Sequence, residues 1–153
     1  VLSTLHTNDA PSSLTRLHDL GVQPFLTAAT ILGVLAQRLV RRLCPLCKQE
    51  TAINEQEWEH LTFDYMMDMP TTMYKAVGCE ACRHTGYKGR VGIYEFMPVS
   101  LELKSIISAH GTLNDLKAQS KKEGVEPLRI AGARKVIEGA TTLEEVLRVV
   151  PLS

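Results

Sequence analysis

The sequence has little net charge, few aromatic residues and no long hydrophobic run. Lys and Arg together number 17, as do Asp and Glu, so the formal net charge is zero. A neutral chain has no overall basic surface for DNA or RNA, and 5% aromatic residues leave few rings for base stacking. No apolar run reaches the length of about 18 residues that a membrane-spanning helix requires. The longest candidate, residues 24–40, is interrupted by threonine, glutamine and arginine.

Familiar catalytic motifs are also missing. Gly86, Gly89 and Gly92 lie beside Lys88 and Arg90. They match neither the G-x-x-x-x-G-K-[ST] phosphate loop nor a glycine fingerprint that opens a helix. Because the flanking residues have the composition of strands, we interpret these glycines as turn residues. The chain has no obvious magnesium-binding acidic strand and no nucleophile–base pair, so it contains no complete active site by itself.

The sequence does contain four cysteines, which form two C-x-x-C pairs. Cys44 and Cys47 are followed by 31 residues and then by Cys79 and Cys82. Two such pairs supply four thiolates, which suit tetrahedral zinc. The intervening segment exceeds the roughly 15–20 residues of a zinc ribbon, but the entropy of loop closure grows only slowly with length. We predict a closed, structural zinc site in a cytosolic protein, with His84 at the surface. Free buried cysteines, disulfides or a redox pair are the alternatives.

The opening segment, VLSTLHTNDA, is the second feature. Residues 1–5 have the composition of a strand, and His6 follows in a polar turn. α/β enzymes place polar site residues just past the ends of strands. An incidental histidine, in a turn that caps the next helix, fits the spacing equally well. Chains seldom begin inside a buried strand, and no methionine precedes Val1, so we expect a piece of a longer protein.

Periodic apolar residues predict a mixed α/β chain. We expect strands over residues 1–5, 74–77 and 91–96, and helices over 11–20, 23–42, 55–61, 101–108, 113–123, 127–138 and 143–149. Asp9 can cap the first helix. Thr142 begins a capping box in which Glu145 reaches back, and Thr112 begins a looser one.

Three arginines, Arg38, Arg41 and Arg42, fall in the last turns of the expected helix over residues 23–42. Cations are favourable near the C-terminus of a helix, so a solvated helix end explains them. Contact with a phosphate or with a partner subunit explains them equally well.

Five segments occur in this order along the chain: VLSTLHTNDA, RLHDLGVQPF, GVLAQRLVRRLCPLC, GCEACRHTGYKGRVGIYEF and ATTLEEVLRV. Together they closely resemble the C-terminal half of bacterial secretion ATPases. The family includes the type II secretion ATPase (general secretory pathway protein E) and relatives that assemble type IV pili. Its RecA-like core carries a Walker A loop, an acidic box, a Walker B segment and then a histidine box. The first three would lie upstream of Val1. The resemblance covers nearly the whole chain, except about residues 48–74.

The resemblance implies roles for particular residues. His6 matches the histidine box, near the terminal phosphate of the nucleotide, where it helps to couple hydrolysis to subunit motion. Arg38 and Arg41 match basic positions with roles in core packing or subunit contact. The zinc-binding tetracysteine motif maps onto the four cysteines, which disfavours the pilus retraction ATPases because they lack it. Many relatives carry Asp-Gly where this chain has Ala131-Gly132, and no role is assigned there.

The resemblance also implies a fold: the C-terminal part of a RecA-like ATPase domain, a tetracysteine zinc subdomain and a C-terminal helical bundle. We expect these parts to span residues 1–43, 44–98 and 99–153. The intact protein would be a hexamer that binds ATP and Mg between subunits. It would be cytoplasmic and held at the inner membrane by secretion platform proteins, with no nucleic acid partner. Its hydrolysis of ATP would drive pseudopilus assembly and type II protein export.

Two other functions are compatible with parts of this pattern. An ATPase that assembles type IV or MSHA-like pili has the same chemistry and differs in its product. A free-standing zinc module that binds nucleic acid is a remote alternative, because it needs a basic face with interleaved aromatics. Since Walker A and Walker B would lie upstream, we expect this chain alone to hydrolyse no ATP.

Overall fold

The computed structural model describes residues 1–150 and 152, which form two compact units. Unit 1 combines residues 1–37 with 94–127, and unit 2 combines residues 38–93 with those from Leu128 onward. Strands β1 (Gly33–Leu43) and β4 (Tyr87–Pro98) pair in a two-stranded sheet, and each strand contributes to both units. Each unit therefore combines distant parts of the sequence. The division at residues 43 and 98 stays a prediction.

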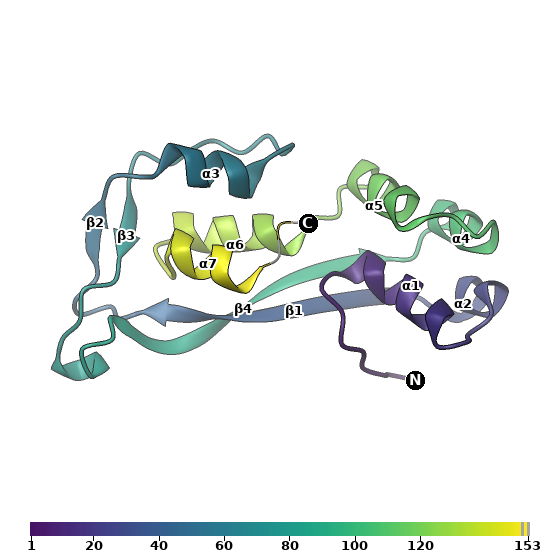
Figure 1. The fold of residues 1–153 in the computed structure, drawn as a ribbon, viewed down its shortest axis with the longest axis horizontal. Helices are drawn as coiled ribbons and strands as arrows, with labels where there is room; N and C mark the ends of the chain where they lie inside the picture. The colour runs from purple at the N-terminus through teal and green to yellow at the C-terminus, as the bar shows by residue number, and fades with distance from the viewer. Residues whose placement is uncertain (151, 153) are drawn as a thin grey trace. The chain divides into compact units, whose positions relative to one another are not determined.

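Unit 1 consists of four helices and one end of each long strand. Helix α2 packs against α4, and α5 packs against both α4 and α1 (Figure 1). Its core consists of small and aliphatic side chains. The buried residues include Ala10, Leu14, Ala28, Met97, Leu103, Ile107 and Leu116. The helices are α1 (Ala10–Asp19), α2 (Pro24–Thr30), α4 (Leu101–Ser108) and α5 (Leu113–Lys122).

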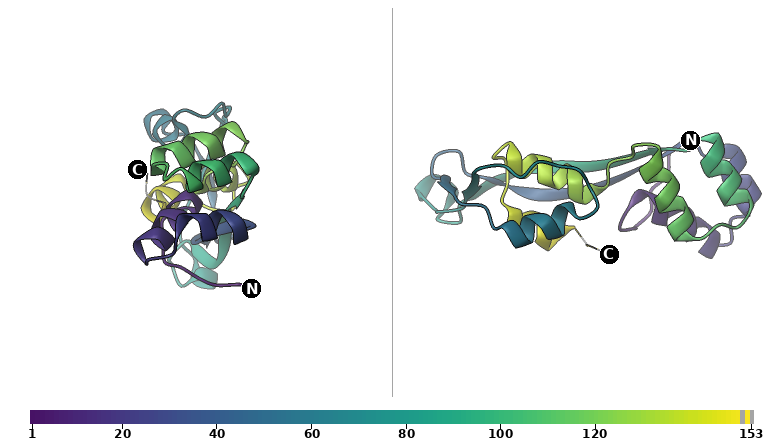
Figure 2. Two further views of the ribbon diagram at one scale, coloured as in Figure 1. Left: turned by 90° about the vertical axis from the view of Figure 1, so that its right-hand side faces the viewer. Right: turned by 90° about the horizontal axis from the view of Figure 1, so that it is seen from above.

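Unit 2 has a second small sheet and three helices. β2 (Gln49–Thr51) pairs antiparallel with β3 (Met73–Lys75), and Glu50 lies opposite Tyr74. Helix α3 packs against α6 and α7 (Figure 2). The buried side chains include Val40, Leu43, Trp58, Leu61, Ile93, Ile130, Val136 and Val146. The other elements are α3 (Glu55–Thr62), the 3₁₀ turn η1 (Glu80–Cys82), α6 (Leu128–Ile137) and α7 (Leu143–Val149).

The expected helix over residues 23–42 is wrong, because α2 ends at Thr30 and an 11-residue strand follows. Ala36 and Val40 are buried on β1 while Leu35 and Leu39 are exposed. The four-residue spacings fit both a helix turn and alternate strand positions. Pairing with β4, more than 40 residues later in the chain, decides between them. The arginines therefore lie on a strand, and the helix-dipole explanation fails.

The expected strand over residues 1–5 is also wrong, since residues 1–7 have no regular secondary structure. Val1 and Leu2 are fully exposed. A strand needs a neighbour to accept its backbone hydrogen bonds, and neither described sheet supplies one to this segment.

The helices near the C-terminal end agree closely with the expected ranges, and α4 and α7 match them at both ends. However, α4 and α5 belong to unit 1 while α6 and α7 belong to unit 2. Gly132 explains the close approach of the last pair, because a Cβ there would lie 2.5 Å from Cγ1 of Val146. No helix of the described residues is long and apolar enough to span a bilayer.

Candidate metal centre and the His6 segment

The four cysteine sulfurs form a compact cluster in unit 2. All four Sγ atoms lie within 4.8 Å of one another. The pairs Cys44–Cys79, Cys47–Cys82 and Cys79–Cys82 are separated by 3.8, 3.9 and 3.8 Å. Four zinc–sulfur bonds of about 2.3 Å in a tetrahedron would place the sulfurs about 3.8 Å apart. A disulfide needs about 2.05 Å, and the four thiols are free. The spacing therefore fits one tetrahedral ion.

Distant backbone segments bring the two cysteine pairs together. Cys44 directly follows β1, and its N–H donates to the carbonyl oxygen of Gly86 at 2.9 Å. In the second pair, Cys79 directly precedes η1 and Cys82 is its last residue, and β4 follows. Between the pairs, pairing of β2 with β3 closes the long insert near its ends. The 31 intervening residues thus form a folded segment whose two ends lie side by side. The length of this segment therefore does not keep the two cysteine pairs apart.

Backbone N–H groups point at two of the sulfurs. Gly78 donates to Sγ of Cys47 at 3.3 Å, and Cys79 and Gly86 both donate to Sγ of Cys82 at 3.2 Å. Such donors stabilise thiolates. At Gly78 φ is +115°, and a Cβ would lie 2.8 Å from the carbonyl oxygen of His84. Glycine is therefore required for this turn.

The thiol environments differ in their effect on pKa. Burial raises the pKa of Cys47 to about 11. Burial also acts to raise the pKa of Cys82, but the N–H donors from Cys79 and Gly86 outweigh it and lower that pKa to about 6. Four sulfurs this close cannot all carry charge without a cation to offset it. A divalent ion satisfies this requirement, so the donor set fits zinc.

The neighbouring residues agree in part with the interpretation from sequence. His84 is exposed and is not part of the sulfur cluster. Gly86 and Gly89 adopt positive φ, +80° and +78°, where glycine is favoured. Gly86 lies in the bend before β4, as expected for a turn residue. Gly89 and Gly92 lie within β4, so the expectation that they are turn residues is wrong.

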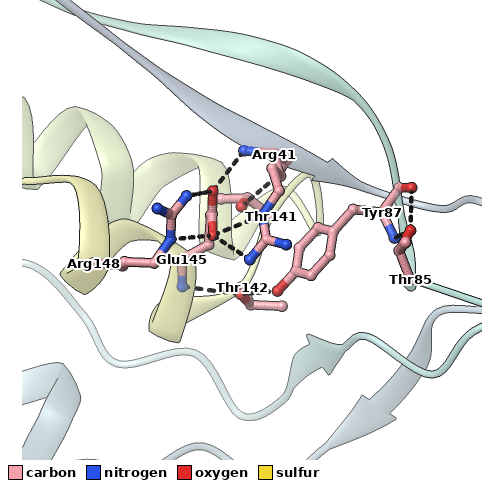
Figure 3. A network of polar contacts seen from close by, with 7 residues as sticks. All are labelled: Arg41, Thr85, Tyr87, Thr141, Thr142, Glu145 and Arg148. Carbon is pink, nitrogen blue, oxygen red and sulfur yellow. Dashed lines mark hydrogen bonds and ion pairs between the residues drawn. The ribbon is translucent and has the colours of Figure 1, made fainter.

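Arg41 is the centre of a polar network beside the long strands (Figure 3). Its guanidinium donates from Nε and Nη2 to Oε2 of Glu145 at 3.1 and 2.9 Å, and its backbone N–H donates to Oε1 at 3.0 Å. Arg148 binds the same carboxylate at 2.7 and 3.1 Å. The Tyr87 ring lies 4.2 Å from the guanidinium carbon of Arg41, and its hydroxyl is 2.8 Å from Oγ1 of Thr142.

Glu145 is only 1% exposed in this network. Burial acts to raise its pKa, but hydrogen bonds from Arg148 and Arg41 outweigh it and lower that pKa to about 2. Thr142 caps α7 as predicted. Glu145 does not complete the capping box, because its carboxylate binds the two arginines. Sequence reasoning missed this role, although Arg148 stands three residues after Glu145 on the same helix.

Among the two basic candidates, Arg41 thus has a packing role inside one chain. Arg38 lies on the same strand and is half-buried. A role for either residue in subunit contact stays a prediction.

His6 lies exposed in the irregular segment before α1. Behind it, Oγ1 of Thr7 lies 2.7 Å from Oγ of Ser13. Asp9 caps α1 as predicted, and its Oδ1 accepts from the N–H of Ser12 at 2.8 Å. The turn is ordered by short-range bonds, while His6 itself faces solvent. The role of His6 stays a prediction.

Comparison with known sequences gives a consistent result. A family described as "Type II/IV secretion system protein" matches residues 1–148. The type IV pilus assembly ATPase TfpB of Acinetobacter baylyi is 69% identical over the whole chain. The type II secretion system protein E of Pseudomonas aeruginosa is 46% identical over 97% of the chain, and the type II secretion system ATPase E of Vibrio cholerae is 43% identical over 97%. The chain spans 26%, 29% and 29% of these relatives' lengths.

Proposed function

This chain belongs to the type II/IV secretion system protein family, and we propose that the intact protein is an ATPase that powers type II secretion. The observation that carries the proposal is the match over residues 1–148, together with identities of 46% and 43% to type II secretion proteins. ATP hydrolysis would drive pseudopilus assembly and the export of folded proteins.

The chain would form the end of a RecA-like core, a zinc subdomain and the C-terminal helices of each subunit in a hexamer. ATP and Mg would bind between subunits, at Walker elements outside this segment. His6 would lie near the terminal phosphate of the nucleotide and couple hydrolysis to subunit motion. Its exposure supports this role, because an exposed imidazole is available to a ligand supplied from elsewhere.

Cys44, Cys47, Cys79 and Cys82 would hold the zinc ion. A tetrathiolate zinc site is closed, so the ion would supply folding energy and no chemistry. It would fasten the end of β1 to the turn before β4, at the base of the insert. The protein would work in the cytoplasm, attached to the inner membrane through platform proteins of the secretion system.

A second candidate is assembly of type IV pili. The 69% identity to a type IV pilus assembly ATPase favours it. The two functions share their chemistry and differ in the fibre that is built. Deleting the gene in its own bacterium separates them. Loss of secreted enzymes with normal surface pili supports secretion, and loss of pili with normal secretion supports pilus assembly.

The enzymatic proposal is tested by ATP turnover of the full-length protein. We expect Mg-dependent hydrolysis, and we expect His6→Ala to lower kcat by about tenfold or more. His60→Ala is the matched control, since His60 is an exposed histidine on α3. The 153-residue chain alone should show no turnover above a heat-killed sample. Equal kcat values for the His6 and His60 variants would contradict the role of His6.

A further inference from the structure

A buried carboxylate holds the start of the helix that follows His6. Glu95 lies on β4 and is 3% exposed. Its Oε1 accepts a hydrogen bond of 2.8 Å from the backbone N–H of Ala10, which is the first residue of α1. The two residues are 85 positions apart, and both belong to unit 1. A strand side chain thus fixes where this helix begins.

This contact adds to a cap that is already present. The first N–H groups of a helix lack intrahelical partners, and Asp9 satisfies one of them through Ser12. Local capping by Asp9 defines the helix but leaves its position free. Glu95 approaches from a separate strand, so its bond to Ala10 ties the helix start to β4. A carboxylate suits this place because the N-terminus of a helix favours negative charge.

A second contact holds the same turn from another side. Nζ of Lys117, on α5, lies 3.5 Å from Oδ2 of Asp9. Thr7 is held through its contact with Ser13. The segment between His6 and Ala10 is therefore fastened at three points, from β4, α1 and α5. His6 is the first residue outside these contacts.

We propose that Glu95 is a positioning residue for His6. By fixing the N–H of Ala10, it sets the place from which the turn projects the histidine toward the nucleotide. Lys117 makes a smaller contribution and links the turn to α5. This inference rests on the proposed function, because it assumes that His6 acts on a bound nucleotide.

The test uses the full-length protein with two substitutions at one position. Glu95→Ala removes the acceptor, whereas Glu95→Gln keeps an oxygen that can accept from Ala10. We expect Glu95→Ala to lower kcat for ATP by about tenfold with KM changed less than about twofold, because binding groups lie elsewhere. We expect Glu95→Gln to restore kcat to within about threefold of the parent. Lys117→Met should lower kcat by about twofold, as for a part-exposed ion pair.

Amide hydrogen exchange gives a readout that does not depend on ATP. Glu95→Ala should speed exchange in peptides covering residues 10–13, whose opening is local. Glu145→Gln is the matched control, because it alters another buried glutamate, in unit 2. It should leave exchange at residues 10–13 unchanged. If Glu95→Ala fails to fold, Glu95→Asp replaces it, since the carboxylate is then one methylene too short to reach Ala10.

The outcomes separate this inference from the proposed function. If the variant that lacks the contact exchanges faster at residues 10–13 but keeps the parent kcat, while His6→Ala loses activity, the inference is wrong and the proposed function stands. If His6→Ala keeps the parent kcat, the proposed role of the histidine fails, and the inference fails with it. Unchanged exchange at residues 10–13 would also overturn the inference.

Discussion

The cysteine centre and the His6 segment differ in how much of their surroundings this chain supplies. At the cysteine centre, four sulfurs and the N–H donors that face them all come from residues 44–86. At the His6 segment, the chain supplies the helix start and its anchors, while the imidazole faces solvent. The first site is complete as a ligand set, whereas the second offers an exposed imidazole, which under the proposed function would face a nucleotide bound by other parts of the protein. Perturbing the first should therefore change stability, and perturbing the second should change activity.

Loss of the metal centre should have the largest effect. Cys79→Ser leaves three thiolates, and zinc binding contributes about 10–16 kcal/mol to the folding of zinc-finger peptides. We expect less than one zinc per chain by mass spectrometry, and proteolysis within the insert before the rest of unit 2 is cut. His84→Ala should keep about one zinc per chain, because that side chain lies outside the cluster. His6→Ala should leave both readouts unchanged.

Unchanged thermal stability and protease resistance in the Cys79 variant would contradict a structural metal. A stability loss in the His6 variant as large as that in the cysteine variant would remove the contrast between the two regions.

The next largest effect should come from Glu145. Glu145 is 1% exposed, but Arg41 and Arg148 are 47% and 59% exposed, so loss of the carboxylate leaves no buried charge unpaired. Hydrogen bonds to charged groups contribute about 1.5–3 kcal/mol, so Glu145→Ala should lower the free energy of unfolding by about that amount in urea titrations. Glu102→Ala is the control, because Glu102 is exposed on α4. A loss below about 1 kcal/mol would show that the pairs with Arg41 and Arg148 contribute no more than surface pairs do.

Stability should also depend on pH through Glu145. Its pKa is lowered to about 2 in the folded chain, against about 4.3 for an ordinary glutamate. The unfolded state therefore binds the proton first as pH falls. The stabilisation is complete above the ordinary pKa and is lost as pH falls from about 4.3 toward 2. Glu145→Gln should remove this component, so the difference between parent and variant unfolding curves measures it. A pH-independent difference would contradict the lowered pKa.

Loss of single helix caps should have the smallest effect. Asp9→Ala and Thr142→Ala each remove a cap worth about 1 kcal/mol. Thr142 also contacts the Tyr87 hydroxyl, so its loss should cost more, as judged by melting temperature. Only the Asp9 substitution should speed amide exchange at residues 10–13. Equal exchange in both variants would show that the turn behind His6 does not depend on its own cap.

The cysteine centre could be predicted from the sequence because its information is local. The spacing within each C-x-x-C pair lets both sulfurs face one point, and a set of four thiolate ligands indicates zinc. The helix caps at Asp9 and Thr142 could be predicted for the same reason. The capping box at Thr112 is complete, since Asp115 reaches back to the Thr112 N–H at 2.8 Å.

The features that could not be predicted depend on partners far along the chain. The apolar spacing of β1 fits both a helix and a strand, and only pairing with β4 distinguishes them. The sequence predicts that the Glu145 carboxylate accepts from the backbone N–H of Thr142 in a capping box. Two arginines, one of them 104 residues away, bind this carboxylate instead, because hydrogen bonds between charged groups are stronger. Glu95 carries no sequence signal at all, because Ala10 contributes only its backbone.

Pairing of β2 with β3 bears on how freely the sequence and length of the insert between these strands can change. The paired strands join the two ends of the insert near the cysteines, and none of the residues between these strands belongs to the cysteine cluster. Trp58 and Leu61 anchor α3 in unit 2, whereas Phe63 and Met66 are exposed beyond it. Tyr65 still contacts Arg129, whose guanidinium carbon lies 5.2 Å from the centre of the tyrosine ring. Residues 66–72, beyond this contact, should therefore tolerate substitutions and changes of length. For the experimenter, this segment is the place in this chain to graft a fluorescent label or an epitope without disturbing the thiolates.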